Sequence, residues 1–261
     1  MRVQCPAKIN LNLKIVNRRD DGFHNIESVM QTISLYDYLT IDSENSAKTS
    51  IELSGNSDEI PYDERNLVYK AAQLFLNETK ISNKNIKIYI EKNIPIEAGL
   101  GGGSADAAGT LFGLNEIFNK PLNRAQLNEQ CAKLGSDLNV CLNGGRLLCK
   151  GRGEILEQLP FEEFDVNLIK PIGLGISAKE AYTKFSQKVK TPDRHDFIND
   201  LEWAIIDDYP QLQQIRSRYK TANMTGSGST YFSIGDNYFE ECEGFWVKNN
   251  LKAVSDGVCV A

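Results

Sequence analysis

The stretch GLGGGSADAAG at residues 99–109 places four glycines within five positions, directly before a serine and an alanine-rich run. Glycine lets the main chain adopt positive φ and approach a ligand closely. The first N–H groups of a helix have no partners inside the helix and carry partial positive charge. A strand, this turn and a helix beginning near Ser104 therefore predict a cradle for phosphate groups.

Other known phosphate loops fit this stretch less well. No lysine precedes Ser104, as the Walker A pattern GxxxxGK[ST] requires, and Ser104 stands where the dinucleotide fingerprint GxGxxG needs its third glycine. The HRD and DFG motifs of protein kinases do not occur in the chain. From this segment alone, a plain glycine turn at a helix entry is the alternative interpretation, and two further segments count against it.

Those segments have the residue types that a phosphoryl-transfer site needs. Asp137 ends GSD just after a predicted helix, and NMTGSGSTYF at 223–232 contains a second glycine turn. Apolar and polar residues alternate in KINLNLKI at 8–15, so Lys8 and Asn10 share one face of a predicted strand. Phosphoryl transfer requires positioning, charge neutralisation and a base, and these segments can supply all three.

The composition is that of an ordinary globular protein. The 261 residues carry a formal net charge of −6, which speaks against general binding to nucleic acid or anionic membranes. The N-terminus lacks the apolar run of a signal peptide, and no stretch approaches the roughly 18 apolar residues of a membrane span. Six scattered cysteines without a CxxC pair, and only two histidines, speak against a zinc site. We therefore expect a cytoplasmic protein whose thiols are reduced and mostly buried.

The hydrophobic periodicity predicts a mixture of helices and strands without a regular βαβ repeat. Helices are expected at 66–78, from near Ser104 to Phe118, and at 124–135, 177–185, 197–206, 209–219 and 238–249. Strands are expected at 8–15, in two runs within 27–42 around a turn at Leu35–Asp37, and at 86–90, 145–149, 166–171, 221–234 and near 252–259. A polar linker is expected around Thr191–His195. The pattern predicts an α+β protein with two domains, 1–159 and 160–261.

Taken together, three segments resemble the motifs of the GHMP kinase superfamily, which includes galactokinase, homoserine kinase and mevalonate kinase. They are PAKINLNL at 6–13, PIEAGLGGGSADAAG at 95–109 and NMTGSGSTYF at 223–232, in the family's order and at its spacing. The resemblance implies a two-domain GHMP kinase fold. Its N-terminal domain would be ribosomal protein S5 domain 2-like and bind ATP, and its C-terminal domain would be a ferredoxin-like α/β domain.

Within the superfamily, DGFH at 21–24, GRGE at 151–154 and NDLE at 199–202 resemble the branch that phosphorylates diphosphocytidyl-methylerythritol in the non-mevalonate isoprenoid pathway. The resemblance implies transfer of the ATP γ-phosphoryl group to the 2-hydroxyl of the methylerythritol moiety, with Mg²⁺ bound to the nucleotide. No side chain is assigned to a metal, although Glu97 and Asp106 are the candidates if a carboxylate ligates the ion. The oligomeric state stays open between monomer and homodimer.

The same resemblance assigns roles to individual residues. Asp137 matches the catalytic aspartate that accepts the hydroxyl proton, and Lys8 matches the lysine that keeps this aspartate ionised and offsets charge on the transferring group. Asn10 would join Lys8 in the acceptor site. Phe23 and His24 match the pair that contacts the cytosine, one with an aromatic face and the other with a ring nitrogen.

The remaining assignments concern glycine-rich backbone and one asparagine. The triphosphate is assigned to the first glycine stretch: Gly99, Leu100, Gly101, Gly102, Gly103 and Ser104. Asn66 matches a position near the adenine or ribose, with a helix N-cap as the rival interpretation. Gly226 and Ser227 would close the acceptor side, although hairpin geometry alone could also explain this turn.

Three positions depart from the family pattern. Leu138-Asn139 follows the aspartate where a small residue or proline is common, Ala178 replaces a threonine, and Met30 stands where a phenylalanine is frequent. These changes bear on acceptor binding rather than on the class of reaction. Two other functions stay open: a kinase of the same fold acting on homoserine or mevalonate, against which DGFH argues, and a nucleotide-binding relative without catalysis, against which Lys8 and Asp137 argue.

Overall fold

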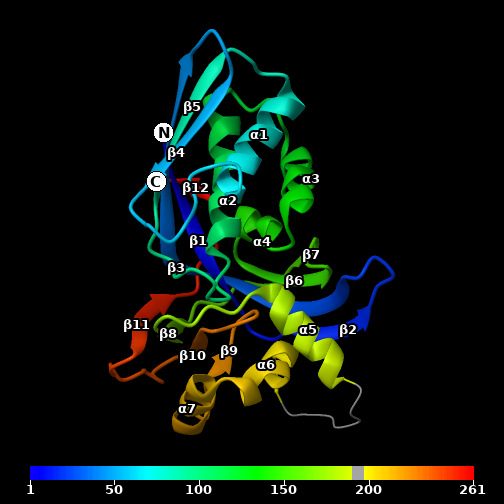
Figure 1. The fold of residues 1–261 in the computed structure, drawn as a ribbon, viewed down its shortest axis with the longest axis vertical. Helices are drawn as coiled ribbons and strands as arrows, with labels where there is room; N and C mark the ends of the chain where they lie inside the picture. The colour runs from blue at the N-terminus through cyan, green and yellow to red at the C-terminus, as the bar shows by residue number, and fades with distance from the viewer. Residues whose placement is uncertain (190–196) are drawn as a thin grey trace.

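The fold consists of two sheets and the helices that cover them (Figure 1). The structure is a computed structural model that describes residues 1–189 and 197–261. The larger sheet contains β1 (Arg2–Asn10), β2 (Lys14–Arg18), β3 (His24–Asn45), β4 (Ser50–Gly55), β5 (Lys84–Glu91), β6 (Arg146–Gly151), β7 (Ile155–Gln158) and β12 (Cys259–Val260). The smaller sheet contains β8 (Asp165–Pro171), β9 (Asn223–Met224), β10 (Tyr231–Ile234) and β11 (Phe245–Lys252). The helices are α1 (Leu67–Thr79), α2 (Gly102–Ile117), α3 (Arg124–Leu134), α4 (Leu138–Asn143), α5 (Ala178–Lys188), α6 (Asp200–Ile205), α7 (Pro210–Arg218) and a 3₁₀ turn, η1 (Ile206–Asp208).

The larger sheet has the order β12-β1-β3-β5-β4, with β2 and β6 paired to β3 and β7 paired to β6. Its pairs are antiparallel except β4 with β5. The smaller sheet has the order β11-β8-β10-β9. The chain passes to the smaller sheet after β7, and β12 returns to the larger sheet beside β1, so the two termini lie close together (Figure 1). The domain boundary at 159/160 stays a prediction.

The alanine-rich run after the glycines packs α2 closely against the larger sheet. Ala105, Ala107 and Ala108 are fully buried. A Cβ at Gly109 would lie 2.3 Å from Cys5 Sγ, and one at Gly113 would lie 2.6 Å from Ile41 Cδ1. Larger side chains on this face would push the helix away from the sheet. The small residues therefore fix the height of the helix, and with it the position of the helix N-terminus.

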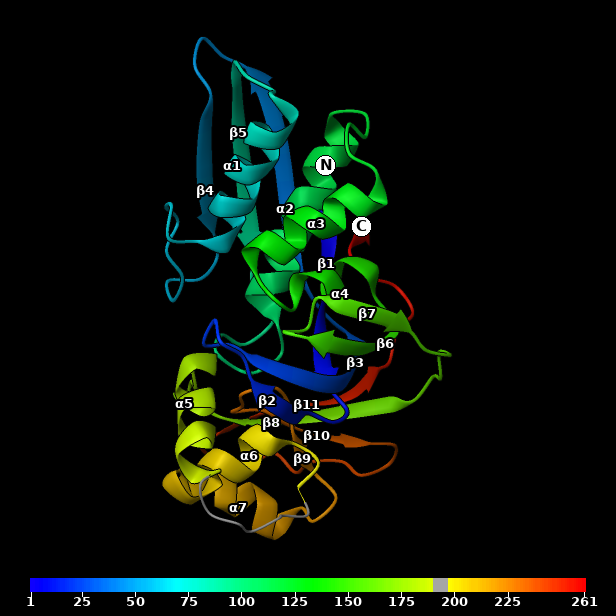
Figure 2. The same cartoon turned by 90° about the vertical axis from the view of Figure 1, so that its right-hand side faces the viewer.

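Helices α5, α6 and α7 pack against the smaller sheet (Figure 2), and α5 also lies beside β2 of the larger sheet, whose Ile15 packs against the same core. A separate core joins the two sheets, with Ile9 and Ile33 from the larger sheet, Leu168 and Phe232 from the smaller, and Leu100 from the glycine stretch. The first glycine stretch is thus anchored where the two sheets meet.

Two strand predictions within the first 42 residues were wrong in detail. The predicted turn at Leu35–Asp37 is a bulge within one continuous strand, β3, whose register with β1 shifts between Pro6 and Ala7. A bulge breaks the alternation of side chains without reversing the chain, so its sequence pattern resembles that of a turn. The predicted strand at 8–15 is interrupted after Asn10, because the side chain of Asn12 binds the Val29 N–H at 2.6 Å in place of a ladder partner.

The predicted helix at 238–249 was also wrong. Residues from Phe245 onwards form β11, which pairs with β8, and Gly244 before it has a φ of +84°. A left-handed glycine interrupts a helix, while Phe, Trp and Val in succession favour a strand. The helix expected at 197–206 is shorter, because α6 begins after Asn199. The linker expected around Thr191–His195 lies outside the described residues. In the described residues, the mixed α+β organisation is as predicted.

Four of the six cysteines are buried and all six are free thiols, as expected. Burial raises the pKa of Cys131 and of Cys149 to about 12. Among the described helices, none is long and apolar enough to cross a membrane.

Candidate active site

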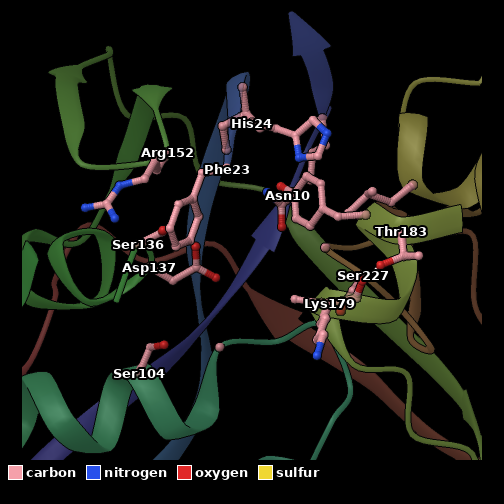
Figure 3. A pocket seen from close by; sticks show the side chains of 18 of the residues that line it. Asn10, Phe23, His24, Ser104, Ser136, Asp137, Arg152, Lys179, Thr183 and Ser227 are labelled. Carbon is pink, nitrogen blue, oxygen red and sulfur yellow. Dashed lines mark hydrogen bonds between the residues drawn. The ribbon is translucent and has the colours of Figure 1, made fainter. Parts of the chain in front are cut away.

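A pocket of about 790 Å³ opens between the glycine stretch, the β2–β3 turn, α5 and the second glycine turn (Figure 3). Its wall brings together segments more than 200 residues apart in the sequence, from Lys8 to Ser227. The predicted site residues that line it are Lys8, Asn10, Phe23, His24, Gly99, Gly101, Ser104, Asp137, Gly226 and Ser227. Leu100, Gly102, Gly103 and Asn66 do not contribute to this wall.

Lys8 and Asp137 form an ion pair at the centre of the site. Lys8 Nζ lies 3.1 Å from Asp137 Oδ2 and donates a hydrogen bond of 2.7 Å to Asn10 Oδ1. The lysine is only 3% exposed, whereas the aspartate is 29% exposed. A buried ammonium needs a partner charge, and Asp137 supplies it. The structure thus brings the two residues together, while their catalytic roles stay a prediction.

The strand that carries Lys8 is joined directly to the first glycine stretch. The Lys8 N–H donates to Leu100 O at 2.9 Å, while the Leu100 side chain is buried in the core between the sheets. A Cβ at Gly101 would lie 3.0 Å from Lys8 Cγ, so the absence of a side chain there makes room for the lysine stem. Leu100 therefore anchors the glycine stretch rather than lining the pocket.

The first turn of α2 is well suited to hold an anion. Gly101, with a φ of +73°, is the N-cap residue, and the helix begins at Gly102, two residues earlier than predicted. No side chain caps this end of the helix, so its first N–H groups are left for water or a ligand. Ser104 lies in the first turn with its hydroxyl in the pocket wall (Figure 3). This arrangement matches the phosphate cradle that the sequence predicts.

A buried group of three charges supports the glycine stretch from behind. Lys92 forms ion pairs with Asp37 and, at 2.8 Å, with Asp106, and all three side chains are at least nine-tenths buried. Asp37 Oδ1 also accepts hydrogen bonds from the N–H groups of Asn93 and Ile94, at 2.6 and 2.8 Å. The group thereby fixes the segment that leads from β5 into the glycines. Burial raises the pKa of Asp106 to about 7, against the opposing effect of Lys92.

The outer end of the pocket is aromatic. The ring of His24 stacks on Tyr182, with centroids 5.1 Å apart and planes at 17°, and its Nε2 lies 3.1 Å from Ser186 Oγ. Burial, and then the charge of Arg18, lower the pKa of His24. The imidazole is therefore neutral at neutral pH and keeps one nitrogen as a donor and one as an acceptor. Phe23 is 53% exposed and carries the Arg152 guanidinium over its ring, 5.0 Å from the centroid.

The second glycine turn packs onto the first glycine stretch and onto Lys8. A Cβ at Gly226 would lie 2.9 Å from Gly99 O and 3.3 Å from Lys8 Nζ. Thr225 Oγ1 accepts a hydrogen bond of 2.9 Å from the Asn10 N–H. The glycines here permit close approach of two backbones, which a hairpin alone would not require.

Asn66 is the N-cap of α1, since its side chain accepts a hydrogen bond of 2.9 Å from the Val68 N–H. Its Nδ2 donates to Pro61 O at 2.7 Å. The rival interpretation of Asn66 as a cap is thus confirmed, and its contact with adenine or ribose stays a prediction.

Several lining residues were not found from the sequence. They are mainly on α5 and the neighbouring turns: Arg18, Ser136, Arg152, Lys179, Tyr182, Thr183 and Ser186. Tyr182 and Ser186 are one helical turn apart, so an aromatic and a hydroxyl on the same face of the predicted helix were the available signal. Within the described residues, no three His, Cys, Asp or Glu side chains form a group that could hold a metal ion.

Comparison with known proteins places this chain in a family. The family of GHMP kinase N-terminal domains matches residues 66–145. A 4-diphosphocytidyl-2-C-methyl-D-erythritol kinase of Clostridium tetani is 42% identical, over 90% of this chain and 90% of its own length. One of Syntrophomonas wolfei is 36% identical over 89% and 88%.

Solved structures agree with these relatives. A crystal structure of 4-(cytidine 5'-diphospho)-2C-methyl-D-erythritol kinase matches with a TM-score of 0.76 and 26% identity, covering 97% of this chain and 100% of that one. A homoserine kinase from Cytophaga hutchinsonii has a TM-score of 0.74 at 15% identity and covers 100% and 97%, a likeness of fold alone. The chain thus has the two-domain α+β fold of the GHMP kinases, as predicted. It belongs to the 4-diphosphocytidyl-2-C-methyl-D-erythritol kinase family.

Proposed function

We propose that this chain transfers the γ-phosphoryl group of ATP to the 2-hydroxyl of 4-diphosphocytidyl-2-C-methyl-D-erythritol. The observation that carries the proposal is the Lys8–Asp137 ion pair, which lies between the uncapped N-terminus of α2 and the aromatic end of the pocket. Family membership and the kinase names of its relatives support the same reaction.

The two ends of the pocket suit the two substrates. The triphosphate of ATP would bind the backbone N–H groups at the start of α2, where the helix dipole favours negative charge. The cytosine would lie against Phe23 and hydrogen-bond His24, whose neutral ring can both donate and accept. This orientation would bring the methylerythritol moiety between them, beside Asp137.

The chemical step follows from the central pair. The acceptor hydroxyl oxygen forms a bond to the γ-phosphorus, the bond from that phosphorus to the β–γ bridging oxygen breaks, and ADP leaves. Asp137 accepts the hydroxyl proton, while Lys8, 3.1 Å from its carboxylate, offsets charge on the phosphoryl oxygens. Asn10 fixes the lysine head through its 2.7 Å hydrogen bond.

Mg²⁺ would accompany the nucleotide and neutralise phosphate charge. Among the side chains that sequence reasoning considered, Ser104 fits such an ion, because its hydroxyl lies at the start of α2 in the pocket wall. Asp106 does not fit, because its carboxylate is buried and bound to Lys92. The side chain of Glu97 lies against Gly175, outside the pocket wall. We therefore propose no carboxylate ligand for Mg²⁺.

The cytoplasmic location and the oligomeric state stay predictions.

The test is an ADP-release assay with the diphosphocytidyl acceptor, wild type against Asp137→Asn. Loss of the proton acceptor should lower kcat by about 100-fold or more, while the Kd for ATP changes little. The exposed Asp58→Asn variant is the matched control and should behave as wild type. Equal or faster phosphorylation of homoserine or mevalonate would contradict the choice of acceptor, and a wild type that binds ATP without turnover would favour a non-catalytic relative.

A further inference from the structure

The NDLE segment at 199–202 lies outside the chemistry described above, yet one of its side chains is joined to the pocket. Asn199 is 1% exposed. Its Nδ2 donates to Met224 O at 2.8 Å and to Gly226 O at 2.9 Å. Its Oδ1 accepts from the Leu201 N–H at 2.9 Å and caps α6. One buried amide thus connects a helix of the smaller sheet to the second glycine turn.

By binding the Gly226 carbonyl oxygen, Asn199 fixes the direction of the neighbouring Ser227 N–H. A peptide unit is planar and trans, so its N–H points opposite to its carbonyl. Holding Gly226 O toward Asn199 therefore turns the Ser227 N–H away from Asn199. Among the described residues, this N–H has no acceptor, and both residues belong to the pocket wall. An unpaired backbone N–H in a pocket wall is a site for an anionic oxygen.

The turn packs so closely on the first glycine stretch that a small change in its orientation would be felt in the pocket. A Cβ at Gly99 would lie only 2.2 Å from Thr225 O, which shows how closely the two glycine segments pack. The Thr225 N–H, in the peptide unit of Met224 O, donates to Thr230 O at 3.0 Å. Asn199 therefore holds the two peptide units that determine how the turn faces the pocket.

We infer that Asn199 is a positioning residue, which aims the Ser227 N–H at an anionic phosphate oxygen of the bound substrates. This inference rests on the proposed function. The oxygen belongs either to the diphosphate of the acceptor or to the phosphoryl group in transfer. The first source predicts a rise in the KM for the acceptor, and the second predicts a fall in kcat.

The sharpest test is Asn199→Asp, because aspartate keeps the oxygen that caps α6 and loses both donors to the turn. We expect kcat/KM for the acceptor to fall about tenfold or more, with the KM for ATP changed less. A buried carboxyl facing two carbonyl oxygens has a raised pKa, and its protonated form regains one donor. The activity of the variant relative to wild type should therefore recover as the pH is lowered, which a loss of folding would not produce.

Asn123→Asp is the matched control, since Asn123 also caps a helix, α3, by accepting a hydrogen bond, and it does not line the pocket. Asn199→Ser serves if the aspartate variant does not fold, because serine caps well, adds no charge and is too short to reach both carbonyls. It should give the same loss without the recovery at low pH.

The two proposals fail in different ways. A wild type that does not phosphorylate the acceptor contradicts the proposed function. A wild type that is active, with a folded Asn199 variant whose kcat and both KM values match the Asn123→Asp control, contradicts only the role of Asn199.

Discussion

The two glycine segments of the pocket, 99–104 and 225–230, face each other but are supported by different chemistry. Behind the first lie three buried charges, Lys92 between Asp37 and Asp106. Behind the second lie the neutral amide of Asn199 and the carboxylate of Glu202, which accepts hydrogen bonds from Tyr231 and the Met224 N–H. Under the proposed function, both segments would direct backbone donors toward ligands that carry phosphate.

The difference predicts how each segment fails. Removing one member of a buried ion group leaves an uncompensated charge, which costs more than the whole group contributes. Removing one neutral hydrogen bond leaves the remaining partners in place and costs less. A single substitution behind the first segment should therefore lower the stability of the whole fold. Each substitution behind the second segment should instead lower activity by a limited amount. Four substitutions test this contrast.

The largest effect should come from Lys92→Met. The variant leaves Asp37 and Asp106 buried side by side without their cation. The free energy of unfolding should fall by about 3–5 kcal/mol, measured by denaturant unfolding at neutral pH. Lys87→Met is the control, because Lys87 pairs with Glu44 at 2.9 Å on the exposed surface, where an ion pair contributes little. Equal losses of unfolding free energy in the two variants would mean that burial of the charges does not decide the cost. The expected difference between the two glycine segments would then have no basis.

Gly99→Ala should break the contact between the two segments. A Cβ here meets Thr225 O at 2.2 Å and forces the backbones apart, at a φ of +73°. Displacement of catalytic groups by about 1 Å can lower kcat/KM about 100-fold, and we expect a loss of that size in steady-state assays. Gly235→Ala separates the effect of the positive φ from that of the close contact, because Gly235 has a similar φ of +70° and nothing within 4 Å of its Cβ position. It should lose about 1 kcal/mol of stability and keep its activity.

The sequence predicted the pocket better than it predicted the support behind it. The glycines, Lys8, Asp137 and His24 lie in short motifs that resemble those of a known family, so the sequence pointed to them. Lys92 and Asn199 have ordinary residue types, and their roles depend on partners 55 and 25 positions away. No local pattern encodes such pairs.

The errors in the fold have a related cause. The bulge in β3 and the strand β11 are decided by pairing with β1 and β8, which local periodicity does not include. Asp106 was a candidate ligand in case a carboxylate binds the metal, and its burial against Lys92 speaks against that role. The predicted helix α2, whose apolar face follows local spacing, was right to within two residues at its start.

Asp106→Asn should change how stability depends on pH. The pKa of Asp106, raised by burial to about 7, lies above its usual value, so the folded state binds a proton that the unfolded state releases. This contribution is present in acid and is lost as the pH rises from about 4 to about 7. The asparagine variant lacks it. Relative to the variant, wild type should lose on the order of 3 kcal/mol of unfolding free energy over that interval.

Denaturant unfolding at about pH 4.5 and pH 7 measures this difference. The exposed Asp58→Asn variant should follow the pH dependence of wild type. If the unfolding free energies of Asp106→Asn and wild type changed in parallel with pH, the charges behind the first segment would be fully compensated. The expected difference between the two glycine segments would then be wrong.

The smallest effect should come from Tyr231→Phe, behind the second segment. The Tyr231 hydroxyl donates to Glu202 Oε1 at 3.0 Å, and the buried carboxylate also has Arg216 at 3.2 Å and the Met224 N–H at 3.2 Å. Because these partners remain, we expect a loss near the lower end for a hydrogen bond to a charged group, about 1.5 kcal/mol in unfolding free energy. Burial raises the pKa of Glu202, and losing a hydrogen bond to its charged form should raise that pKa further.

The control for this variant is Tyr238→Phe, since Tyr238 is 47% exposed and its hydroxyl lies 3.5 Å from Asp236. It should leave stability unchanged in the same unfolding experiment. If Tyr231→Phe instead cost as much as Lys92→Met, Glu202 would depend on a complete set of partners. The second glycine segment would then be lost as a unit, as the first is, because a buried carboxylate rather than the Asn199 amide would determine its position.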